Sequence, residues 1–255
     1  MKHFNRALIT GATGGLGETL AHFLASKNIP LILTGRDEAK LNTLAASFKN
    51  VIICTADLAK QDERKKVIAL IHNYTPDLVI NNAGFGLYGD ILNYSTAEQM
   101  EILEVNANAV LELTIETART LIQQKKQGSI LNVSSGAAFF PFPAFSVYAA
   151  SKSFVTQFSE SFDAEVSSQG VRILAACPGQ IDTKFRKVAS KGKSPHKSIF
   201  SMSKEKAVKL IWKQIEKEIP CFIFDYRTTF SVFICRFIPK PLLKKILRKF
   251  ITTRT

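Results

Sequence analysis

The sequence has few of the residues that commonly bind metals or form disulfide bridges. Its 255 residues include only four cysteines and four histidines, and no two cysteines form a CxxC pair. The cysteines have apolar neighbours, which is typical of buried, reduced thiols, and no histidine lies at metal-ligand spacing from another ligand residue. We therefore expect no structural metal and no disulfide framework.

The sequence also lacks a hydrophobic run that could cross a membrane. Its longest uncharged stretch, residues 127–151, is interrupted by glycine, serine and proline, a pattern that indicates a strand, a loop and a helix start. Residues 1–4 lead directly into a short apolar run and carry no apolar signal segment. We expect a protein of a reducing, cytoplasmic compartment.

Acidic residues are scarce in the last part of the chain. Residues 184–255 contain 19 lysines and arginines against four acids, whereas residues 1–183 contain 15 against 17. The net charge of +13 therefore belongs to one end of the chain. No nucleic-acid-binding motif accompanies this charge, so we expect no nucleic-acid partner.

What the sequence does contain is an alternation of short aliphatic runs with helical patterns. The apolar runs are residues 7–10, 30–35, 51–55, 78–82, 129–135, 171–177 and 221–224. Helical patterns, such as those of residues 16–27 and 62–74, lie between most of them. This alternation predicts a three-layer α/β fold, a doubly wound parallel sheet of about seven strands with helices on both faces. We expect a single domain over residues 1–225.

A glycine-rich stretch follows the first apolar run and precedes a helical pattern. It is Thr10-Gly11-Ala12-Thr13-Gly14-Gly15-Leu16-Gly17. Glycines at such a place let the backbone turn sharply and approach a pyrophosphate, whose charge then lies at the helix N-terminus. The strand–loop–helix context predicts a dinucleotide site, and the alternative is an ordinary tight turn.

Further candidate cofactor contacts follow the next three strands. The second strand ends at Arg36, whose guanidinium suits the 2′-phosphate of NADP(H), whereas an acid there would favour NAD(H). Asp57 and Leu58 follow the third strand, where they could flank an adenine ring, and Asn81-Asn82-Ala83-Gly84 follows the fourth. We expect NADP(H) rather than NAD(H), the alternative being a solvated Arg36 at a helix start.

Four polar residues form a candidate catalytic set. Tyr148 and Lys152 are spaced i, i+4 on one face of a predicted helix, and Ser135 ends the fifth strand 13 positions before Tyr148. The fourth residue, Asn106, lies earlier in the chain, in the segment Glu104-Val105-Asn106-Ala107. Ligands of open α/β sheets bind at the carboxyl ends of the strands, so we expect these elements to converge there.

In order and spacing, the sequence resembles the short-chain dehydrogenases/reductases over residues 5–183. The matching motifs are TGATGGLG, NNAG, Asn106, Ser135, YAASK and PGQIDT. The glycine loop fits TGxxxGxG through Gly15 and Gly17, but through Gly14 it also fits TGxxGxxG, which marks longer sugar-nucleotide epimerases and dehydratases. The short chain and NNAG favour the single-domain branch, whose fold is Rossmann-like.

The resemblance implies a role for each catalytic candidate. Tyr148 would give a proton to the carbonyl oxygen in reduction or take one from the alcohol in oxidation, and Ser135 would hydrogen-bond that oxygen. Asn106 would hold a water that relays protons to Lys152. Lys152 would also bind the nicotinamide ribose and, with the oxidised nicotinamide, lower the pKa of Tyr148 from its usual value near ~10.

The resemblance also implies the cofactor contacts and the reaction. The expected contacts are Gly11, Thr13, Gly15, Leu16, Gly17, Arg36, Asp57, Leu58, Asn82, Ala83, Gly84, Tyr148, Lys152, Pro178, Gly179, Ile181 and Thr183. Of these, Ile181 and Thr183 would bind the carboxamide and the pyrophosphate. The implied activity interconverts a ketone or aldehyde with an alcohol, with NADP(H) as the hydride donor or acceptor. An epimerase or dehydratase and a non-catalytic, cofactor-sensing regulator are the alternatives.

The substrate and the oligomeric state are less well defined. Aromatic residues in segments 85–88 and 139–145 predict an apolar or lipid-like substrate, with packing beneath a lid or at a subunit contact as the alternative. The basic segment 184–200 predicts a mobile lid. Family members commonly form homodimers or homotetramers through helices that correspond to residues 106–126 and 146–168.

Residues 226–255 form a predicted C-terminal extension with eight lysines and arginines and no acid. Within residues 242–251, apolar side chains recur at helical spacing opposite lysines and arginines, and residues 230–238 carry a similar apolar stripe. Such a basic amphipathic helix suits an anionic membrane surface, on which it would lie without spanning the bilayer. Packing on the protein itself or on a partner is the alternative.

Overall fold

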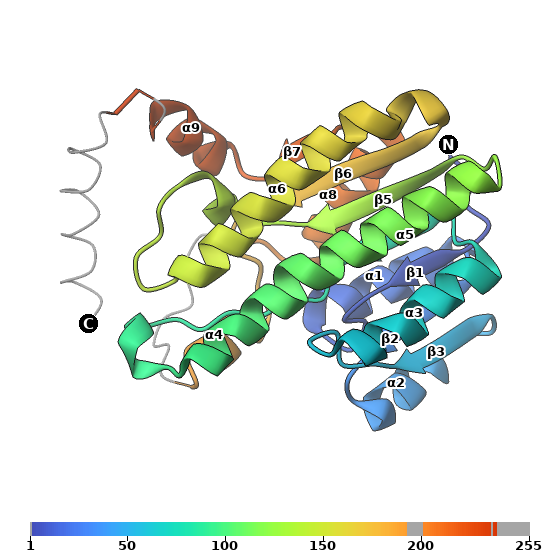
Figure 1. Cartoon of the computed structure of the whole chain (residues 1–255), viewed down its shortest axis with the longest axis horizontal. Coiled ribbons are helices and arrows are strands. Elements are labelled where there is room, and N and C mark those ends of the chain that lie inside the picture. Colours follow the sequence, from blue (N-terminus) through green and yellow to red (C-terminus); the bar gives the residue numbers. More distant parts are fainter. Residues whose placement is uncertain (1, 193–200, 236, 239–255) are drawn as a thin grey trace.

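Seven parallel strands form one sheet in the part of the chain that the structure describes, residues 2–192, 201–235 and 237–238 of a computed structural model (Figure 1). The spatial order is β3-β2-β1-β4-β5-β6-β7. The strands are β1 (Ala7–Ile9), β2 (Leu31–Gly35), β3 (Val51–Thr55), β4 (Leu78–Asn81), β5 (Gly128–Val133), β6 (Val171–Cys177) and β7 (Cys221–Ile223). The predicted doubly wound α/β fold is confirmed.

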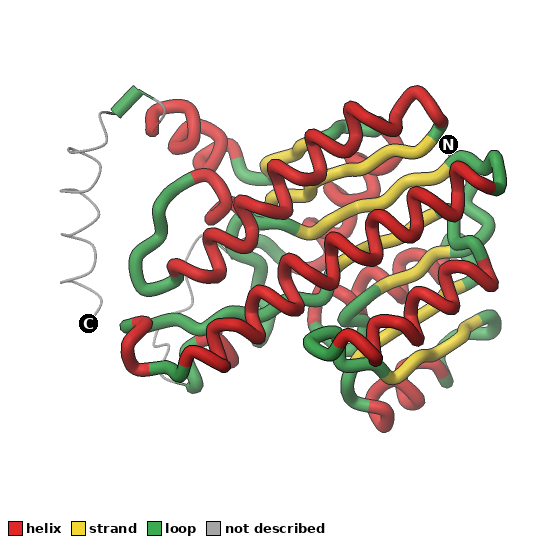
Figure 2. Tube along the Cα trace, in the orientation of Figure 1, coloured by secondary structure: helices red, strands yellow, loops and turns green. Residues whose placement is uncertain are grey.

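Helices cover both faces of this sheet. The helices are α1 (Gly15–Ser26), α2 (Glu38–Ala45), α3 (Gln61–Tyr74), α4 (Thr96–Leu103), α5 (Ala109–Gln123), α6 (Ser146–Val166), α7 (Phe185–Ala189), α8 (Lys204–Lys217) and α9 (Tyr226–Cys235). In Figure 2, α3, α5 and α6 lie in front of the strands. Helices α1, α2 and α8 pack on the opposite face.

The strands are apolar on both sides because both faces are covered. In β1, Ala7 and Ile9 belong to the core beneath α1 and α8, whereas Leu8 belongs to the core beneath α3 and α5. The same alternation occurs in β2, where Leu31 and Leu33 face one core and Ile32 faces the other. Burial on both faces explains the uninterrupted aliphatic runs of the sequence.

The order of the strands reverses next to β1, which lies between β2 and β4. Connections from β1 and β4 therefore leave in opposite directions and open a crevice at the carboxyl ends of these strands. The glycine-rich stretch follows β1, and Asn82 follows β4, so both lie at the edge of this crevice. The fold thus positions the site before any side-chain detail is considered.

Some predicted boundaries differ from those of the structure. Strand β5 ends at Val133, so Ser135 lies two residues beyond the strand instead of ending it. Segment 193–200 of the predicted lid and residues 239–255 of the predicted amphipathic helix lie outside the described residues. In the described part of the chain, no helix has the length and hydropathy needed to span a membrane.

Candidate active site

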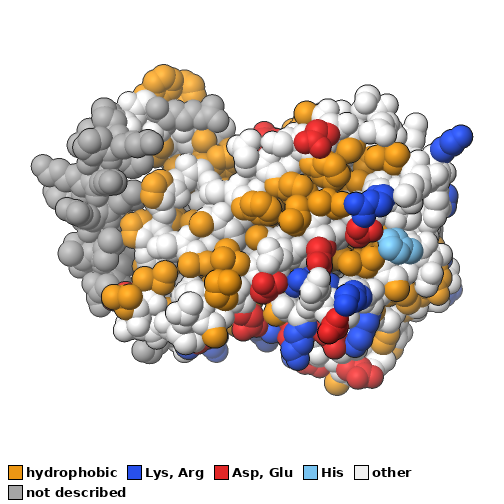
Figure 3. All heavy atoms as spheres, in the orientation of Figure 1, with side chains coloured by type: hydrophobic (Ala, Val, Ile, Leu, Met, Phe, Trp, Pro, Cys, Tyr) orange, Lys and Arg blue, Asp and Glu red, His pale blue; other side chains and the backbone are white. Residues whose placement is uncertain are grey.

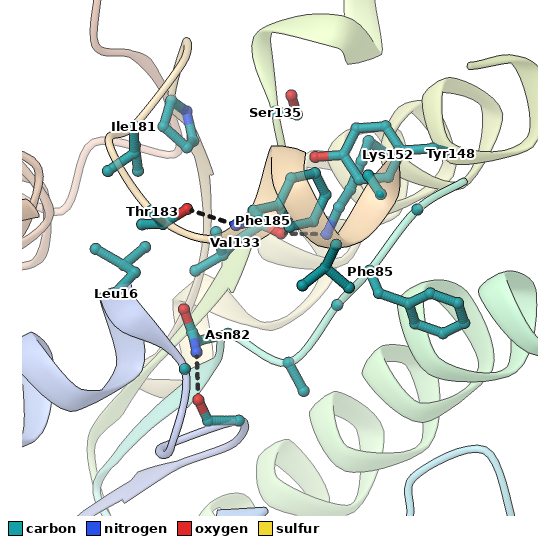
Figure 4. A pocket seen from close by; sticks show the side chains of 18 of the residues that line it. Leu16, Asn82, Phe85, Val133, Ser135, Tyr148, Lys152, Ile181, Thr183 and Phe185 are labelled. Atoms are coloured by element: carbon teal, nitrogen blue, oxygen red, sulfur yellow. Dashed lines mark hydrogen bonds between the residues drawn. The ribbon is translucent and has the colours of Figure 1, made fainter. Parts of the chain in front are cut away.

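The carboxyl ends of the strands surround one cavity of about 1260 Å³. Its lining includes every predicted catalytic and cofactor-binding residue except Gly17 and Asn106. The glycine loop, the segment after β4 and the loop after β6 contribute to one end, and α6 contributes Tyr148 and Lys152 (Figure 4). Residues from distant parts of the sequence therefore meet in a single chamber, as the order of the motifs predicts.

The glycine loop approaches its neighbours too closely for larger side chains. Gly11 has a φ of +63°, and a Cβ placed there would lie 2.8 Å from the Cα of Ala83. Gly17 lies inside α1, where a Cβ would overlap the carbonyl oxygen of Gly11. Gly17 therefore serves the close packing of α1 on the loop, which explains why it does not line the cavity.

The two glycine patterns left open by the sequence can be compared at Gly14 and Gly15. A Cβ at Gly14 would meet only the Gly11 carbonyl oxygen, at an ordinary contact distance of 3.4 Å. A Cβ at Gly15 would lie 3.2 Å from the Cγ2 of Thr183, which is tighter than usual. The local packing therefore demands glycine more strongly at Gly15, the position of the TGxxxGxG pattern.

Two features at this end of the cavity, one in the glycine loop and one in β2, fit a dinucleotide. Gly14 is the N-cap of α1 and has no side-chain capping bond, so the amides of the first helical turn face the cavity without a side-chain acceptor. Such amides, at the positive end of a helix, suit a pyrophosphate. Nearby, the buried Oγ1 of Thr34 has no hydrogen-bond partner among the described residues, and Thr34 lines the cavity.

Asn82 ties the end of β4 to the glycine loop. Its Nδ2 donates to the backbone oxygens of Thr10 at 2.9 Å and of Gly11 at 3.1 Å. Figure 4 shows the position of Asn82 below Leu16 of α1. The Oγ1 of Thr10 in turn accepts from the backbone amides of Asn82 and Ala83, each at 3.0 Å. These reciprocal bonds fix the spacing between the two loops on either side of the crevice.

Arg36 lies at the far end of the cavity, after β2. Its NH1 is 3.6 Å from the Oε1 of Glu101 on α4, and both side chains are largely exposed. Asp37 beside it is the N-cap of α2 and accepts from the backbone amide of Lys40 at 3.0 Å. The Lys40 ammonium, which also contacts this carboxylate, is the main cause that lowers the pKa of Asp37, and the backbone amide adds to it. Asp57 and Leu58 line the same end.

Tyr148 and Lys152 project from α6 into the opposite end of the cavity. The Nζ of Lys152 donates to the backbone oxygen of Val133 at 2.8 Å and lies 5.8 Å from the centre of the Tyr148 ring. The hydroxyl of Tyr148 points toward Ser135 (Figure 4). The Oγ of Ser135 accepts from the backbone amide of Ala137 at 3.1 Å. The three predicted polar groups thus lie around one point.

Burial controls the proton affinities at this end of the cavity. It raises the pKa of Tyr148 to about 12, although the hydrogen bond with Ser135 acts in the opposite direction. It also lowers the pKa of Lys152 to about 8, because the ammonium is removed from water. In the protein alone, burial therefore outweighs the lowering of the pKa of Tyr148 by Ser135. The expected lowering by Lys152 together with the oxidised nicotinamide stays a prediction.

Asn106 lies outside the cavity in a π-helical turn, Glu104–Asn108, between α4 and α5. Its Oδ1 accepts from the backbone amide of Phe85 at 3.0 Å, and its Nδ2 donates to the Phe85 oxygen at 2.9 Å and to the Oγ of Ser151 at 3.1 Å. The side chain therefore holds the segment after β4 against α6. Its expected role in a water relay stays a prediction.

Aromatic rings surround Tyr148. Phe145 stacks on Tyr148 with ring centres 4.2 Å apart, and Phe185 of α7 lies 5.5 Å away on a tilted plane. Tyr88 packs edge-on against Phe145 at 5.7 Å. Gly86 leaves space for this arrangement, since a Cβ there would lie 2.6 Å from the Phe145 ring. These rings make the surroundings of the phenol apolar.

The sequence did not indicate that α9 lines the cavity. Arg227, Thr228 and Ser231 face it, although residues 226–255 were expected to form a separate extension. Helix α9 comes close because a glycine lies opposite: a Cβ at Gly136 would be 2.8 Å from the Cγ2 of Thr228. No local pattern announces such a contact between segments about ninety residues apart in the chain.

Within residues 2–192, 201–235 and 237–238, no cluster of three or more potential metal ligands occurs.

Comparison with known proteins decides which family has this site. A family model described as short chain dehydrogenase matches residues 5–194. The chain belongs to this family. Relatives of this short-chain dehydrogenase include Sulfoacetaldehyde reductase 2 of Chromohalobacter salexigens, which is 33% identical over 193 residues, covering 72% of this chain and 76% of that protein. The predicted family and the predicted oxidoreductase class are confirmed.

Solved structures share the fold. A short-chain dehydrogenase from Sphingobium yanoikuyae in complex with NADPH superposes with a TM-score of 0.79 at 23% identity, covering 92% of this chain and 97% of that one. The bulky-bulky ketone specific alcohol dehydrogenase from Comamonas testosteroni gives 0.77 at 22% identity, covering 94% and 96%. This short-chain dehydrogenase is an oxidoreductase of CH–OH and C=O groups.

Proposed function

We propose that this short-chain dehydrogenase uses NADP(H) to interconvert an apolar or lipid-like ketone or aldehyde with the corresponding alcohol. The observation that carries the proposal is the meeting of Ser135, Tyr148 and Lys152 within an aromatic enclosure at one end of the cavity. The glycine loop and Arg36 lie at the cofactor end of the same cavity. When bound, the nicotinamide ring donates or accepts the hydride.

Each polar side chain at the catalytic end has a distinct proposed role. Tyr148 donates a proton to the carbonyl oxygen during reduction and removes it from the alcohol during oxidation. Ser135 donates a hydrogen bond to the same oxygen and so stabilises the charge that develops there. Lys152 binds the nicotinamide ribose, and Asn106 holds the backbone of Phe85 close to α6 and supports the proton relay.

The preference for NADP(H) rests on Arg36. A guanidinium after β2 suits a 2′-phosphate, and Lys40 on the first turns of α2 adds a second positive charge to the cavity lining. The remaining cofactor contacts are proposed to be those predicted from the motifs, with Gly17 supporting the loop instead of touching the cofactor. Solved structures of similar fold include complexes with NADPH and with NADH.

The apolar substrate is inferred from the rings around Tyr148. Tyr88, Phe142, Phe145 and Phe185 all line the cavity. Removing a bulky hydrophobic group from water into such an enclosure is favourable by roughly 25 cal/mol per Å² of apolar surface. A similar fold serves an enzyme whose name specifies bulky-bulky ketones, which agrees with this substrate class.

The test is a panel of lipophilic and small ketones and aldehydes, assayed with NADPH and NADH for the wild type and for Tyr148→Phe. We expect turnover of the lipophilic members with NADPH, and a loss of about 10² to 10⁴ in kcat for the variant. The variant should bind NADPH as tightly as the wild type. Turnover by Tyr148→Phe at a rate close to that of the wild type would refute the assignment.

We further propose that two copies of the chain associate through α5 and α6. On the face shown in Figure 3, hydrophobic side chains gather over these helices. Phe154, Phe158 and Phe162 form a stack along α6 with ring centres 5.8 and 5.6 Å apart, and Phe154 remains exposed. Sedimentation equilibrium should give a dimer or tetramer that Phe154→Glu dissociates. The control, Leu92→Glu, changes an exposed leucine outside these helices.

Peripheral membrane association of residues 226–255 is a separate proposal. Helix α9 exposes Tyr226, Phe230 and Phe233, and the basic residues of 239–255 follow directly in the sequence. Aromatic side chains beside a basic segment suit an anionic lipid surface. The full chain should co-sediment with phosphatidylcholine vesicles that contain phosphatidylglycerol but not with pure phosphatidylcholine. A chain without residues 239–255 should pellet less; equal pelleting of both would refute the proposal.

A further inference from the structure

Arg64 carries a buried positive charge that the reaction does not use. It lies at the end of the first turn of α3 and is only 5% exposed. Its Nε donates to the Oε2 of Glu112 at 2.6 Å, and its NH1 donates to the Oε2 of Glu104 at 3.0 Å and to the backbone oxygen of Leu58 at 2.9 Å. A guanidinium that is removed from water needs such partners, so the geometry around Arg64 is strongly determined.

One of these partners belongs to the cofactor end of the cavity. Asp57 and Leu58 line the cavity at the carboxyl end of β3, where the adenosine part of a dinucleotide is proposed to bind. The Oδ1 of Asp57 accepts from the backbone amide of Ala59 at 3.1 Å, which shapes the turn locally. The NH1 of Arg64 donates to the carbonyl oxygen of the next residue, Leu58. The position of Leu58 therefore depends on the guanidinium.

A second partner belongs to the turn that contains Asn106. Glu104 is the first residue of the π-helical turn, and its Oε1 accepts from the Nδ2 of Asn108 at 2.9 Å. Arg64 therefore holds Glu104, and the bond between Glu104 and Asn108 links the first and last residues of the π-helical turn. Asn106, in the middle of this turn, holds the backbone of Phe85 beside the catalytic end of the cavity.

Glu104 and Glu112 depend on Arg64 for charge balance. Both carboxylates contact the same guanidinium, and their side chains are about one-third exposed. A second cavity of about 400 Å³ lies beside them and is lined by Gln61, Arg64, Glu104 and Glu112 among other residues. Without the guanidinium, two carboxylates would face each other across this space and repel. The turn would then be free to shift away from α3.

We propose that Arg64 is a positioning residue that couples the adenosine end of the cavity to the turn that holds Asn106. The inference rests on the proposed function in that it takes Asp57 and Leu58 as adenosine contacts and Asn106 as a support of the catalytic end. Arg64 fixes both through one guanidinium, and no other side chain among the described residues hydrogen-bonds to both segments. Its loss should therefore affect cofactor affinity and turnover together.

The primary experiment measures binding of 2′,5′-ADP and 5′-ADP by calorimetry, which does not require turnover. For Arg64→Met, which keeps an unbranched apolar stem but removes the guanidinium and its donors, we expect both ligands to bind about tenfold more weakly. Hydrogen exchange within residues 104–108 should become faster. The kcat of the reductase reaction should fall several-fold, whereas a purely structural role would leave kcat unchanged in the folded protein.

Two further variants separate the two connections. Glu104→Gln keeps the bond of Arg64 to Leu58, so it should bind both adenosine ligands like the wild type but show faster exchange at residues 104–108 and a lower kcat. Arg172→Met is the matched control, because Arg172 bridges Asp163 and Glu218 at the amino end of β6 and does not line the cavity. It should lose stability without changing ligand affinity or kcat.

The possible outcomes distinguish this inference from the proposed function. If the wild type binds the adenosine ligands but reduces no carbonyl compound, the proposed substrate class fails while the binding test of Arg64 stands. If folded Arg64→Met binds both ligands and turns over like the wild type, the inference is overturned. If Arg64→Met does not fold, Glu104→Gln decides, and unchanged exchange and kcat in that variant overturn the coupling.

Discussion

The ring of Phe145 lies almost parallel to the ring of Tyr148, with ring centres 4.2 Å apart and planes inclined by 22°. Phe145 is the N-cap residue of α6, so the same helix start that places Tyr148 also places its cover. This cover contributes to the burial that raises the pKa of Tyr148 to about 12. The stacking partner therefore controls how easily the phenol releases its proton.

The variant Phe145→Ala should consequently lower the pKa of Tyr148, because water would reach the phenol and stabilise the phenolate. In the pH profile of alcohol oxidation, the rise in kcat/KM should move to lower pH. The matched control is Phe142→Ala. The ring centre of Phe142 lies 6.1 Å from that of Phe145, and among the described residues Phe142 has no ring contact with Tyr148. A profile that is identical in Phe145→Ala and the wild type would contradict this account.

The glycine loop provides a second prediction, on stability. Gly17→Ala places a methyl group against the carbonyl oxygen of Gly11, which is backbone and cannot turn away. We expect this variant to lose roughly 1–3 kcal/mol of unfolding free energy, as overpacked interiors do, and to bind NADPH more weakly. Gly14→Ala is the control, because its methyl group would make only an ordinary contact at 3.4 Å. Thermal and urea unfolding of both variants will measure the difference.

Much of the fold and part of the site followed from the sequence for identifiable reasons. Aliphatic runs that alternate with helical patterns can be buried only in a parallel sheet covered on both faces. Once that sheet is assumed, Ser135, Tyr148 and Lys152 can be expected to converge at its carboxyl edge, and the resemblance of the motifs to a family supports the same set. These inferences use local patterns and one rule of topology, so they needed no knowledge of side-chain packing.

What the sequence could not provide depends on contacts between distant segments. The bonds of Asn106 to the backbone of Phe85 require a π-helical turn that no local pattern announced. The raised pKa of Tyr148 results from burial among rings contributed by separate segments, including Phe185 of α7. The approach of Thr228 to Gly136 lies partly beyond the family match, where no motif guides prediction.

Arg36 gives a prediction on cofactor choice. Arg36→Gln removes the charge proposed to bind the 2′-phosphate, so kcat/KM with NADPH should fall about ten- to a hundredfold, while the value with NADH changes little. Arg119→Gln is the control, because Arg119 is an exposed arginine whose ion-pair partner, Glu116, also lies on α5. An equal loss with both cofactors would show that Arg36 does not select between them.

Glu101 should oppose Arg36 in this selection. Its Oε1 lies 3.6 Å from the NH1 of Arg36, so a phosphate bound there would meet a nearby carboxylate. Glu101→Gln should therefore raise the ratio of kcat/KM for NADPH over NADH. The effect should be less than about tenfold, because both side chains are exposed and solvent weakens their interaction. Raising the ionic strength should reduce the difference between variant and wild type, and a lowered ratio would contradict the prediction.

Lys152 makes the stability of the protein depend on pH in a predictable direction. Burial lowers its pKa from 10.5 to about 8 in the folded chain, whereas the unfolded chain keeps the ordinary value. Below pH 8, both states carry the proton, and the folded state bears the full free energy of burying the charge. Between pH 8 and 10.5, the folded state loses the proton first, so the unfolding free energy should rise with pH.

The measurement compares the wild type with Lys152→Met by urea unfolding at several pH values from 7 to 10. The difference in unfolding free energy should move in favour of the wild type by up to about 3 kcal/mol across this range. The raised pKa of Tyr148 acts at higher pH and is present in both proteins, so it largely cancels. A difference that stays constant from pH 7 to 10 would mean that Lys152 keeps its ordinary pKa in the folded protein, so that both states hold the proton over this range.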